Sequence, residues 1–246
     1  MNNLPLTKYP EITLLIPTYN RRKFLPLILR NIYIQDYPHD KIKVLFDDDG
    51  KDKLFIDSEL NQVREELKPI RFDTMNHNEW RSIGTKRNNL IKCCTTKIFA
   101  FMDDDDIYMP TYLSHSYSTL KLNNAGCVGS DKMLFCMTDK DFGVYAMNCG
   151  NNIHLIHEAT IMATKKWFKG SCKFSENSAG EGKNLFEGQK NKVAITDIKN
   201  IMICIQHDSN TIDKLQFSDP KYKIDLQLEP KMIELIQMIF NYEKDT

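Results

Sequence analysis

The chain has 246 residues and carries 33 Lys and Arg against 33 Asp and Glu, so its formal net charge is zero. This balance argues against a general binder of nucleic-acid backbones and against a polybasic membrane-surface protein. Hydrophobic residues make up 41% of the chain and charged residues 27%, which is typical of a globular protein rather than a disordered or collagen-like one.

The first half of the chain alternates short apolar runs with amphipathic segments. The runs are too short for helices and suit buried strands, at residues 12–17, 43–46, 70–75 and 97–102. Helices are expected between and after them, over residues 23–35, 58–67 and 82–92. This alternation predicts a mostly parallel sheet flanked by helices, in which ligands bind beyond the carboxyl ends of the strands.

The second half is less regular. A helix is expected over residues 110–122, and strand-like runs follow at 127–135, 143–147 and 159–163. Residues 170–182 form a polar loop, after which we expect a short helical stretch and a strand at 201–205. A last helix carries an apolar stripe that we expect to dock on the core, formed by Met232, Leu235, Ile236, Ile239 and Phe240.

The seven cysteines are odd in number and form no CxxC pair, so the sequence suggests neither a zinc ribbon nor a closed disulfide framework. No 18 apolar residues run together, and the N-terminal segment has no small-residue cleavage site. We therefore expect free thiols, no transmembrane segment and a cytoplasmic protein.

Four adjacent carboxylates, at residues 103–106, follow the fourth predicted strand. Such a cluster is costly unless solvent or a cation relieves the repulsion. Alternate residues of an extended segment project to the same side, which places Asp103 and Asp105 within reach of one divalent ion. The structural alternative for this motif on its own is a solvated acidic turn.

Polar residues also follow the first two predicted strands, and in a parallel sheet these strand ends meet at the same edge. The first strand leads into Tyr19, Asn20, Arg21 and Arg22, and the second into Asp47, Asp48, Asp49 and Gly50. Neither acidic segment has the Gly and Glu positions of an EF-hand loop. Three strand ends with polar side chains therefore converge.

Together these residues resemble the nucleotide-sugar half of the family 2 glycosyltransferases, which have the GT-A fold. The motifs are PTYNR at 17–21, DDG at 48–50, GTKRN at 84–88 and DDDD at 103–106, in matching order and spacing. The chain is similar in detail to the bacterial spore-coat type, in which an Asp-rich strand end runs into IYMP as at 107–110 here. The similarity covers residues 12–211.

The resemblance implies a site for a nucleoside diphosphate sugar, with a UDP-sugar as the first expectation. It implies nucleotide-sugar contacts for Pro17, Thr18, Tyr19, Asn20, Arg21, Asp48, Asp49, Arg87 and Asp104. Thr18 and Tyr19 would flank the base. One of the two carboxylates Asp48 and Asp49, with Asp49 preferred, would accept a hydrogen bond from the imide of the base. Arg87 would face the diphosphate.

The same resemblance implies a DXD pair, Asp103 and Asp105, that binds Mn²⁺ or Mg²⁺. His207 matches a family histidine that can complete the ligands of the metal, although a lone His at a strand end is usually structural. A hard cation on oxygen ligands would neutralise the charge that grows on a departing nucleoside diphosphate.

The acceptor side is less defined. Glu181 occupies the place of an acidic family element, and the resemblance implies that it is the general base of an inverting transfer. The non-functional alternative is that Glu181 is a solvated loop carboxylate. Gly182 departs from the family, because many members have a second Asp there. His154, His157 and Glu158 either line the acceptor cleft or are satisfied polar residues before a strand. The acceptor itself, whether glycan, lipid or protein, is not indicated.

We expect one domain over residues 1–246, with a nucleotide-sugar half at 1–110, an acceptor half with a smaller sheet at 111–215 and a helical extension at 216–246. Two other functions compete with the glycosyltransferase. A degenerate sugar-nucleotide-binding or interaction protein is supported by Gly182. A haloacid-dehalogenase-like phosphatase would carry its DxD on the first strand instead of the fourth. Nucleic acid is not expected as a partner.

Overall fold

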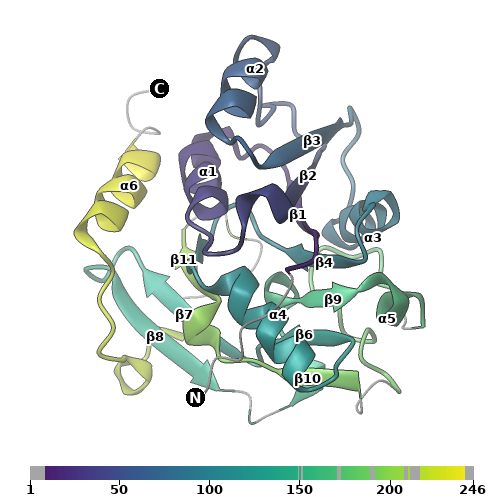
Figure 1. Cartoon of the computed structure of the whole chain (residues 1–246). Coiled ribbons are helices and arrows are strands. Elements are labelled where there is room, and N and C mark those ends of the chain that lie inside the picture. Colours follow the sequence, from purple (N-terminus) through teal and green to yellow (C-terminus); the bar gives the residue numbers. More distant parts are fainter. Residues whose placement is uncertain are drawn as a thin grey trace.

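A computed structural model describes residues 9–148, 150, 152–170, 173–188, 192–207, 210 and 217–241. Cys149, Cys172, residue 211 and the expected boundary at 215–216 lie outside these ranges. Figure 1 shows a central sheet with helices on both faces and a second, smaller sheet next to it. This arrangement confirms the expected α/β fold class with two sheets.

Seven strands of the described part form the central sheet, in the order β10-β6-β9-β4-β1-β2-β3. They are β1 Ile12–Thr18, β2 Ile42–Asp48, β3 Arg71–Asn76, β4 Ile98–Phe101, β6 Cys127–Gly129, β9 Met162–Thr164 and β10 Val193–Ile195. Strand β9 is antiparallel to both neighbours, and the other pairs are parallel. The first four strands match the prediction closely because strands covered on both faces have continuous apolar runs.

The α-helices of the described part follow the expected segments, except that α5 Lys165–Lys169 was not predicted. They are α1 Leu25–Tyr33, α2 Asp57–Glu66, α3 Ile83–Cys93, α4 Tyr112–Leu122, α5 Lys165–Lys169 and α6 Pro230–Asn241. Short 3₁₀ helices lie at η1 Arg22–Phe24, η2 His39–Lys41, η3 Ile153–Leu155, η4 Glu158–Thr160, η6 Ile198–Asn200 and η8 Pro220–Tyr222. Ser82 begins α3 as its N-cap, since its Oγ accepts a hydrogen bond from the Thr85 amide at 3.2 Å.

Alternate residues of β1 serve the two faces of the central sheet. Ile12, Leu14 and Ile16 belong to the larger core, which includes residues of α1, α4 and α6. Leu15 belongs to the second core, which includes residues of α3 and Trp167 of α5. Burial on both faces fixes the strand firmly, so the residues that follow it are held at a defined place on the sheet edge.

The smaller sheet has the order β5-β11-β7-β8, and its strands are β5 Ile107–Tyr108, β7 Lys132–Met137, β8 Gly143–Asn148 and β11 Met202–Gln206. The prediction of one strand over residues 127–135 was wrong. The chain leaves the central sheet after β6 and enters the smaller sheet at β7. The break lies at Ser130, whose amide donates to Thr160 Oγ1 at 2.8 Å instead of continuing a strand ladder.

The structure differs from the sequence-based expectations at three other places. Residues 181–188 form turns rather than the expected short helix, and β10 was not predicted at all. The expected strand at 159–163 begins only at Met162, because Glu158–Thr160 forms a 3₁₀ turn before it. All three differences lie within the acceptor half, where the sequence is polar and periodicity is weak.

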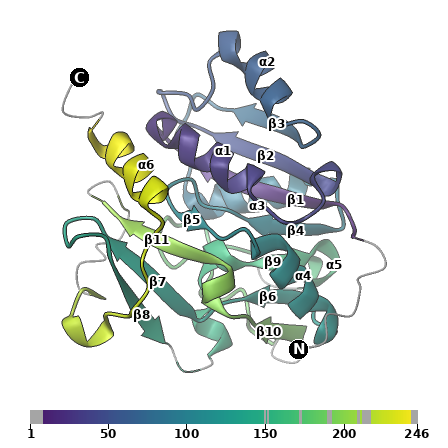
Figure 2. The same ribbon diagram turned by 60° about the vertical axis from the view of Figure 1, so that its left-hand side comes forward.

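Helix α6 docks on the core as expected. Met232, Ile236 and Ile239 are buried, and the Phe240 ring lies 5.9 Å from Phe24 and 5.5 Å from His207. Figure 2 shows the helix next to α1 and close to the end of β11. Among the described residues, no helix has the length and apolar character that a membrane crossing requires. The described cysteines Cys93, Cys94, Cys127, Cys136 and Cys204 are free thiols.

Candidate active site

A cavity of about 1290 Å³ opens where the carboxyl ends of β1 and β4 meet the N-terminus of α3. The predicted residues that line it are Pro17, Thr18, Tyr19, Asn20, Arg21, Arg87, Asp103, Asp104, Asp105 and Glu181. Asp48, Asp49 and His207 do not line it. The sheet therefore brings most of the predicted site into one concave wall, as expected for a ligand site at the edge of a parallel sheet.

The turn after β1 presents an aromatic ring and a cation to the cavity. Asn20 has a φ of +53°, a conformation that asparagine tolerates better than most residues, and the chain bends there. Tyr19 is 41% exposed, which leaves a ring face open for stacking. Arg21 also lines the cavity and reaches the acidic turn at residues 103–106, with its Nη2 3.2 Å from Asp105 Oδ2.

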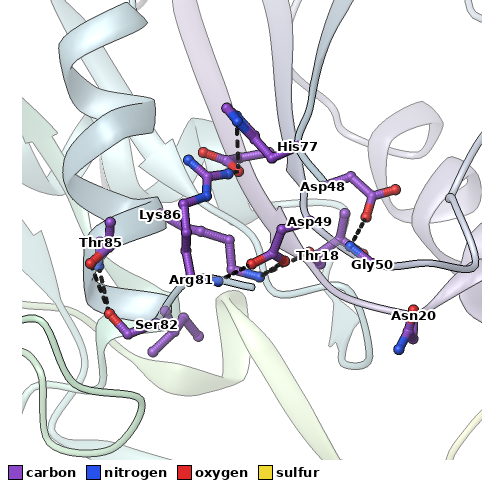
Figure 3. A network of polar contacts seen from close by, with 12 residues as sticks. Thr18, Asn20, Asp48, Asp49, Gly50, His77, Arg81, Ser82, Thr85 and Lys86 are labelled. Carbon is purple, nitrogen blue, oxygen red and sulfur yellow. Dashed lines mark hydrogen bonds and ion pairs between the residues drawn. The ribbon is translucent and has the colours of Figure 1, made fainter. Parts of the chain in front are cut away.

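The carboxylates of the DDG motif are held inside the wall. Asp48 accepts hydrogen bonds from the Gly50 amide at 2.8 Å and the Leu54 amide at 2.7 Å, so it closes the turn after β2. Asp49, whose side chain is fully buried, accepts from Lys86 Nζ at 2.7 Å and from the Arg81 amide (Figure 3). In this arrangement, both carboxylates are engaged by protein groups.

Lys86 and Arg81 of this network were not predicted from the sequence, and Asp47 was expected at the sheet edge but not as a site residue. Lys86 also donates to the Thr18 carbonyl at 2.9 Å and so ties α3 to the end of β1. Arg81 forms an ion pair with the fully buried carboxylate of Asp47. Burial raises the pKa of Asp47, while the positive charge of Arg81 lowers it. Lys86 lies within the GTKRN motif, which was the available signal.

Helix α3 also holds the acceptor-side loop. The Gly84 amide donates to Asn177 O at 3.0 Å, and Asn88 exchanges hydrogen bonds with the backbone of Phe174 at 2.8 and 3.2 Å. A Cβ on Gly84 would lie 1.8 Å from Ser175 O, so only glycine allows this close approach. Gly84 and Asn88, which form this contact, are the first and last residues of the GTKRN motif.

Arg87 links the two halves of the site. It is 2% exposed, and its Nε lies 3.1 Å from Glu181 Oε1 while its Nη2 lies 3.1 Å from Asp103 Oδ1. Burial acts to lower the pKa of Arg87, but Asp103 and Glu181 outweigh it and the net shift is upward. Burial raises the pKa of Glu181, and Arg87 opposes this shift. Arg87 therefore stays charged and fixes both carboxylates.

The four aspartates after β4 have different surroundings. Asp106 is buried and accepts from the Ile205 amide at 2.9 Å, which ties this turn to β11. Asp104 is buried, and burial raises its pKa to about 8, with the charge of Asp105 acting in the same direction and Arg21 opposing. Asp103 and Asp105 keep 20% and 15% of their side chains exposed at the cavity.

His207 contacts one of these two carboxylates. Its Nε2 lies 3.0 Å from Asp105 Oδ2 and 2.9 Å from Asn210 Nδ2. Carboxylate oxygen and imidazole nitrogen are donors that Mn²⁺ accepts, so the donor types fit the implied metal. Within the described ranges, no group of three or more His, Cys, Asp or Glu side chains is already arranged around a metal position. Instead, His207 Nε2 and the Asp105 carboxylate contact each other directly.

The acceptor wall of the cavity contains a second acidic residue besides Glu181. Glu158 lines the cavity together with His157, and its Oε1 accepts a hydrogen bond from the Gly182 amide at 3.1 Å. Trp80 also lines the cavity and is 62% exposed. His154 is exposed and does not line it. Of the polar residues before β9, His157 and Glu158 thus face the cavity.

Solved structures with a similar fold include the following three. The Staphylococcus aureus TarS 1-349 structure is 17% identical over 80% of this chain and 60% of its own, with a TM-score of 0.61. TarS 1-349 in complex with UDP-GlcNAc is 15% identical over 93% and 65%, with a TM-score of 0.59. The mannosyltransferase PcManGT from Pyrobaculum calidifontis, in complex with GDP-Man and Mn²⁺, is 18% identical over 82% and 59%, with a TM-score of 0.61.

At these identities the likeness establishes the GT-A fold, and the chain spans about 60% of the length of both the first TarS structure and PcManGT. A comparison with curated proteins gives no match. Residues 13–167, more than half of the chain, match the sequence model described as "Glycosyl transferase family 2". The chain is therefore a member of glycosyl transferase family 2.

Proposed function

We propose that the chain transfers a sugar from a nucleoside diphosphate sugar to an acceptor hydroxyl, with inversion at the anomeric carbon. The observation that carries this proposal is the convergence of the β1 turn, Arg87 and the acidic turn on one cavity of about 1290 Å³ in a family 2 chain. This volume exceeds the usual 300–1,000 Å³ of a small-molecule pocket, so it has room for a donor and part of an acceptor.

The donor site divides into a base end and a phosphate end. At the base end, Pro17, Thr18, Tyr19 and Asn20 line the wall, and the exposed ring of Tyr19 offers a stacking surface. Asp48 and Asp49 lie in the wall next to this end and do not line the cavity. Asp49 could contact the base only if its hydrogen bonds to Arg81 and Lys86 changed. A UDP-sugar is the first candidate, supported by the TarS complex with UDP-GlcNAc.

At the phosphate end, the residues that would hold Mn²⁺ or Mg²⁺ are Asp103, Asp105 and His207. The metal would supply positive charge to the diphosphate leaving group. The Mn²⁺ complex of the similar PcManGT structure supports this assignment. Arg87 fixes Asp103, and Arg21 and His207 fix Asp105, so these three residues orient the carboxylates toward the cavity. Asp104, which stands between Asp103 and Asp105 in the sequence and is buried, would lie close to the phosphates.

Direct displacement requires one base at the acceptor side. The family resemblance favours Glu181 as this base; Glu181 lines the cavity and forms an ion pair with Arg87. A protein that binds the donor without turnover is the competing function, favoured by the absence of an acidic side chain at Gly182. The phosphatase alternative has no support in the structure, because its DxD would follow β1. The free thiols support a cytoplasmic location as a further part of the proposal.

The test is release of nucleoside diphosphate from UDP-GlcNAc, UDP-glucose and GDP-mannose in Mn²⁺ and in EDTA. We expect release from at least one donor, faster in Mn²⁺, and reduced by Asp105→Ala. Donor binding with no release from the wild-type protein, over a panel of sugar acceptors, would establish the degenerate binding protein instead. Glu176→Gln, at an exposed residue outside the cavity, serves as the control variant.

A further inference from the structure

The carboxylate of Glu158 occupies the space that a side chain at residue 182 would need. A Cβ on Gly182 would lie 2.4 Å from Glu158 Oε1, 2.8 Å from its Cγ and 3.0 Å from its Cδ. These distances are too short for any side chain at residue 182 unless Glu158 moves. A side chain at residue 182 would therefore require the Glu158 side chain to move.

The position of Glu158 is well defined by its backbone. It begins the 3₁₀ turn Glu158–Thr160, which the His157 amide anchors to Ser130 O at 2.9 Å. Thr160 Oγ1 donates to His157 O at 2.7 Å and accepts from the Ser130 amide at 2.8 Å. The Gly182 amide then orients the carboxylate at 3.1 Å. A catalytic group needs this kind of support on a firmly held element.

Glu158 and Glu181 differ in how available their oxygens are. Glu181 is 6% exposed, and one of its oxygens is paired with the Arg87 guanidinium at 3.1 Å. Glu158 is more exposed, lines the cavity, and forms no ion pair with the part of the chain that the structure describes. A base must reach the proton it removes within hydrogen-bond distance, and an oxygen held by a buried guanidinium is poorly placed to do so.

We propose that Glu158 is the general base of the transfer and that Glu181 is a positioning residue that holds Arg87 and, through it, Asp103. This inference rests on the proposed function. In the step, Glu158 takes the proton of the acceptor hydroxyl while that oxygen forms a bond to the anomeric carbon. The bond from the anomeric carbon to the phosphate oxygen breaks, and its electron pair leaves with the nucleoside diphosphate. Charge and atoms balance without any further reactant.

The test uses the full chain, with water as the acceptor and UDP-GlcNAc or GDP-mannose as the donor, and measures nucleoside diphosphate release. Glu158→Gln keeps the size of the side chain and an oxygen for the Gly182 amide. We expect it to lower turnover by about 10² to 10⁴, the usual contribution of a general base, with the donor dissociation constant unchanged within about threefold. Glu187→Gln, at an exposed residue outside the cavity, is expected to behave as wild type.

A swap of the carboxylate separates catalysis from folding. Gly182→Asp alone is expected to lose turnover, because its side chain collides with Glu158. Glu158→Ala removes the carboxylate and opens this space, so the double variant Glu158→Ala/Gly182→Asp should regain at least tenfold turnover over Glu158→Ala. A carboxylate that only supported the loop would give no such recovery in turnover at unchanged donor affinity.

The outcomes distinguish the two proposals. If the wild-type protein binds no sugar nucleotide by calorimetry, the proposed function fails, and this inference fails with it. If the donor binds normally and Glu158→Gln keeps full turnover while Glu181→Gln loses it, the proposed function stands and Glu158 is not the base. Loss of turnover in Glu158→Gln together with recovery in the double variant supports the assignment.

Discussion

Replacement of Arg87 by methionine tests whether this residue holds the two halves of the site together. Methionine keeps much of the length and apolar contact of the side chain but removes its charge. The guanidinium is 3.1 Å from both Glu181 and Asp103 and stacks over the Phe101 ring at 4.8 Å. Without it, two carboxylates remain near each other, and one of them is 6% exposed.

The expected loss follows from the burial of the three charges. Removing one partner of a buried ion pair costs roughly 3–5 kcal/mol, because the other charge stays buried without compensation. Asp103 is 20% exposed, so solvent screens its share, and we expect a total loss of about 3 kcal/mol in the free energy of unfolding. Arg64→Met, at an exposed position on α2, should change it by about 0.5 kcal/mol or less.

Urea unfolding of four proteins measures the coupling: wild type, Arg87→Met, Glu181→Gln and the double variant. In the wild-type background, Glu181→Gln should destabilise, since it breaks the ion pair. In the Arg87→Met background the same substitution should stabilise by about 1–3 kcal/mol, because it removes an unpaired buried charge. If the effect of Glu181→Gln has the same sign and size in both backgrounds, the two residues are not coupled and this account of Arg87 is wrong.

Three further predictions concern the metal site, the acceptor loop and the buried Asp47. Asp105→Ala should abolish the gain in sugar-nucleotide affinity that Mn²⁺ gives over EDTA in calorimetry; a variant that keeps this gain would contradict the metal assignment. Gly84→Ala should destabilise by about 1–3 kcal/mol in urea unfolding, because the new Cβ meets the Ser175 carbonyl, and wild-type stability would refute this packing. Arg81→Met should destabilise more at pH 8 than at pH 5.5. Burial raises the pKa of Asp47 in the folded state, and Arg81 opposes this shift, so the variant should have a higher pKa at Asp47 than the wild type. Above the unfolded pKa of about 3.9, a folded chain with this raised pKa binds more protons than the unfolded chain, so its stability falls as the pH rises. This fall should be larger in the variant. Equal losses at both pH values would exclude Asp47 as the cause.

The donor half of the fold could be predicted from the sequence because its signals are local. Strands β1 to β4 are short apolar runs, and Ser82 marks the start of α3. The split between β6 and β7 could not be predicted, because both are apolar and nothing in a run such as 127–135 states which sheet each part joins. That information lies in the contact between Ser130 and Thr160, which are 30 residues apart.

For the site, the sequence indicated which residues converge but not how their charges pair. Lys86, two positions after Gly84 in the same motif, engages Asp49, so a carboxylate expected to face the base is turned into the wall. The relation between Glu158 and Gly182 joins two loops and depends on a Cβ that is absent. Only the three-dimensional arrangement shows that a side chain at residue 182 would meet the Glu158 side chain.

The measurement that tests the central claim most directly is calorimetric titration of the wild-type chain with UDP-GlcNAc, UDP-glucose and GDP-mannose, in Mn²⁺ and in EDTA. We predict saturable 1:1 binding of at least one of these donors, tighter in Mn²⁺, and weakened by Asp105→Ala. A ligand at 100 times its dissociation constant should also stabilise the fold by about 2.7 kcal/mol. No binding of any of these donors, in either condition, would contradict the claim that this cavity is a sugar-nucleotide site.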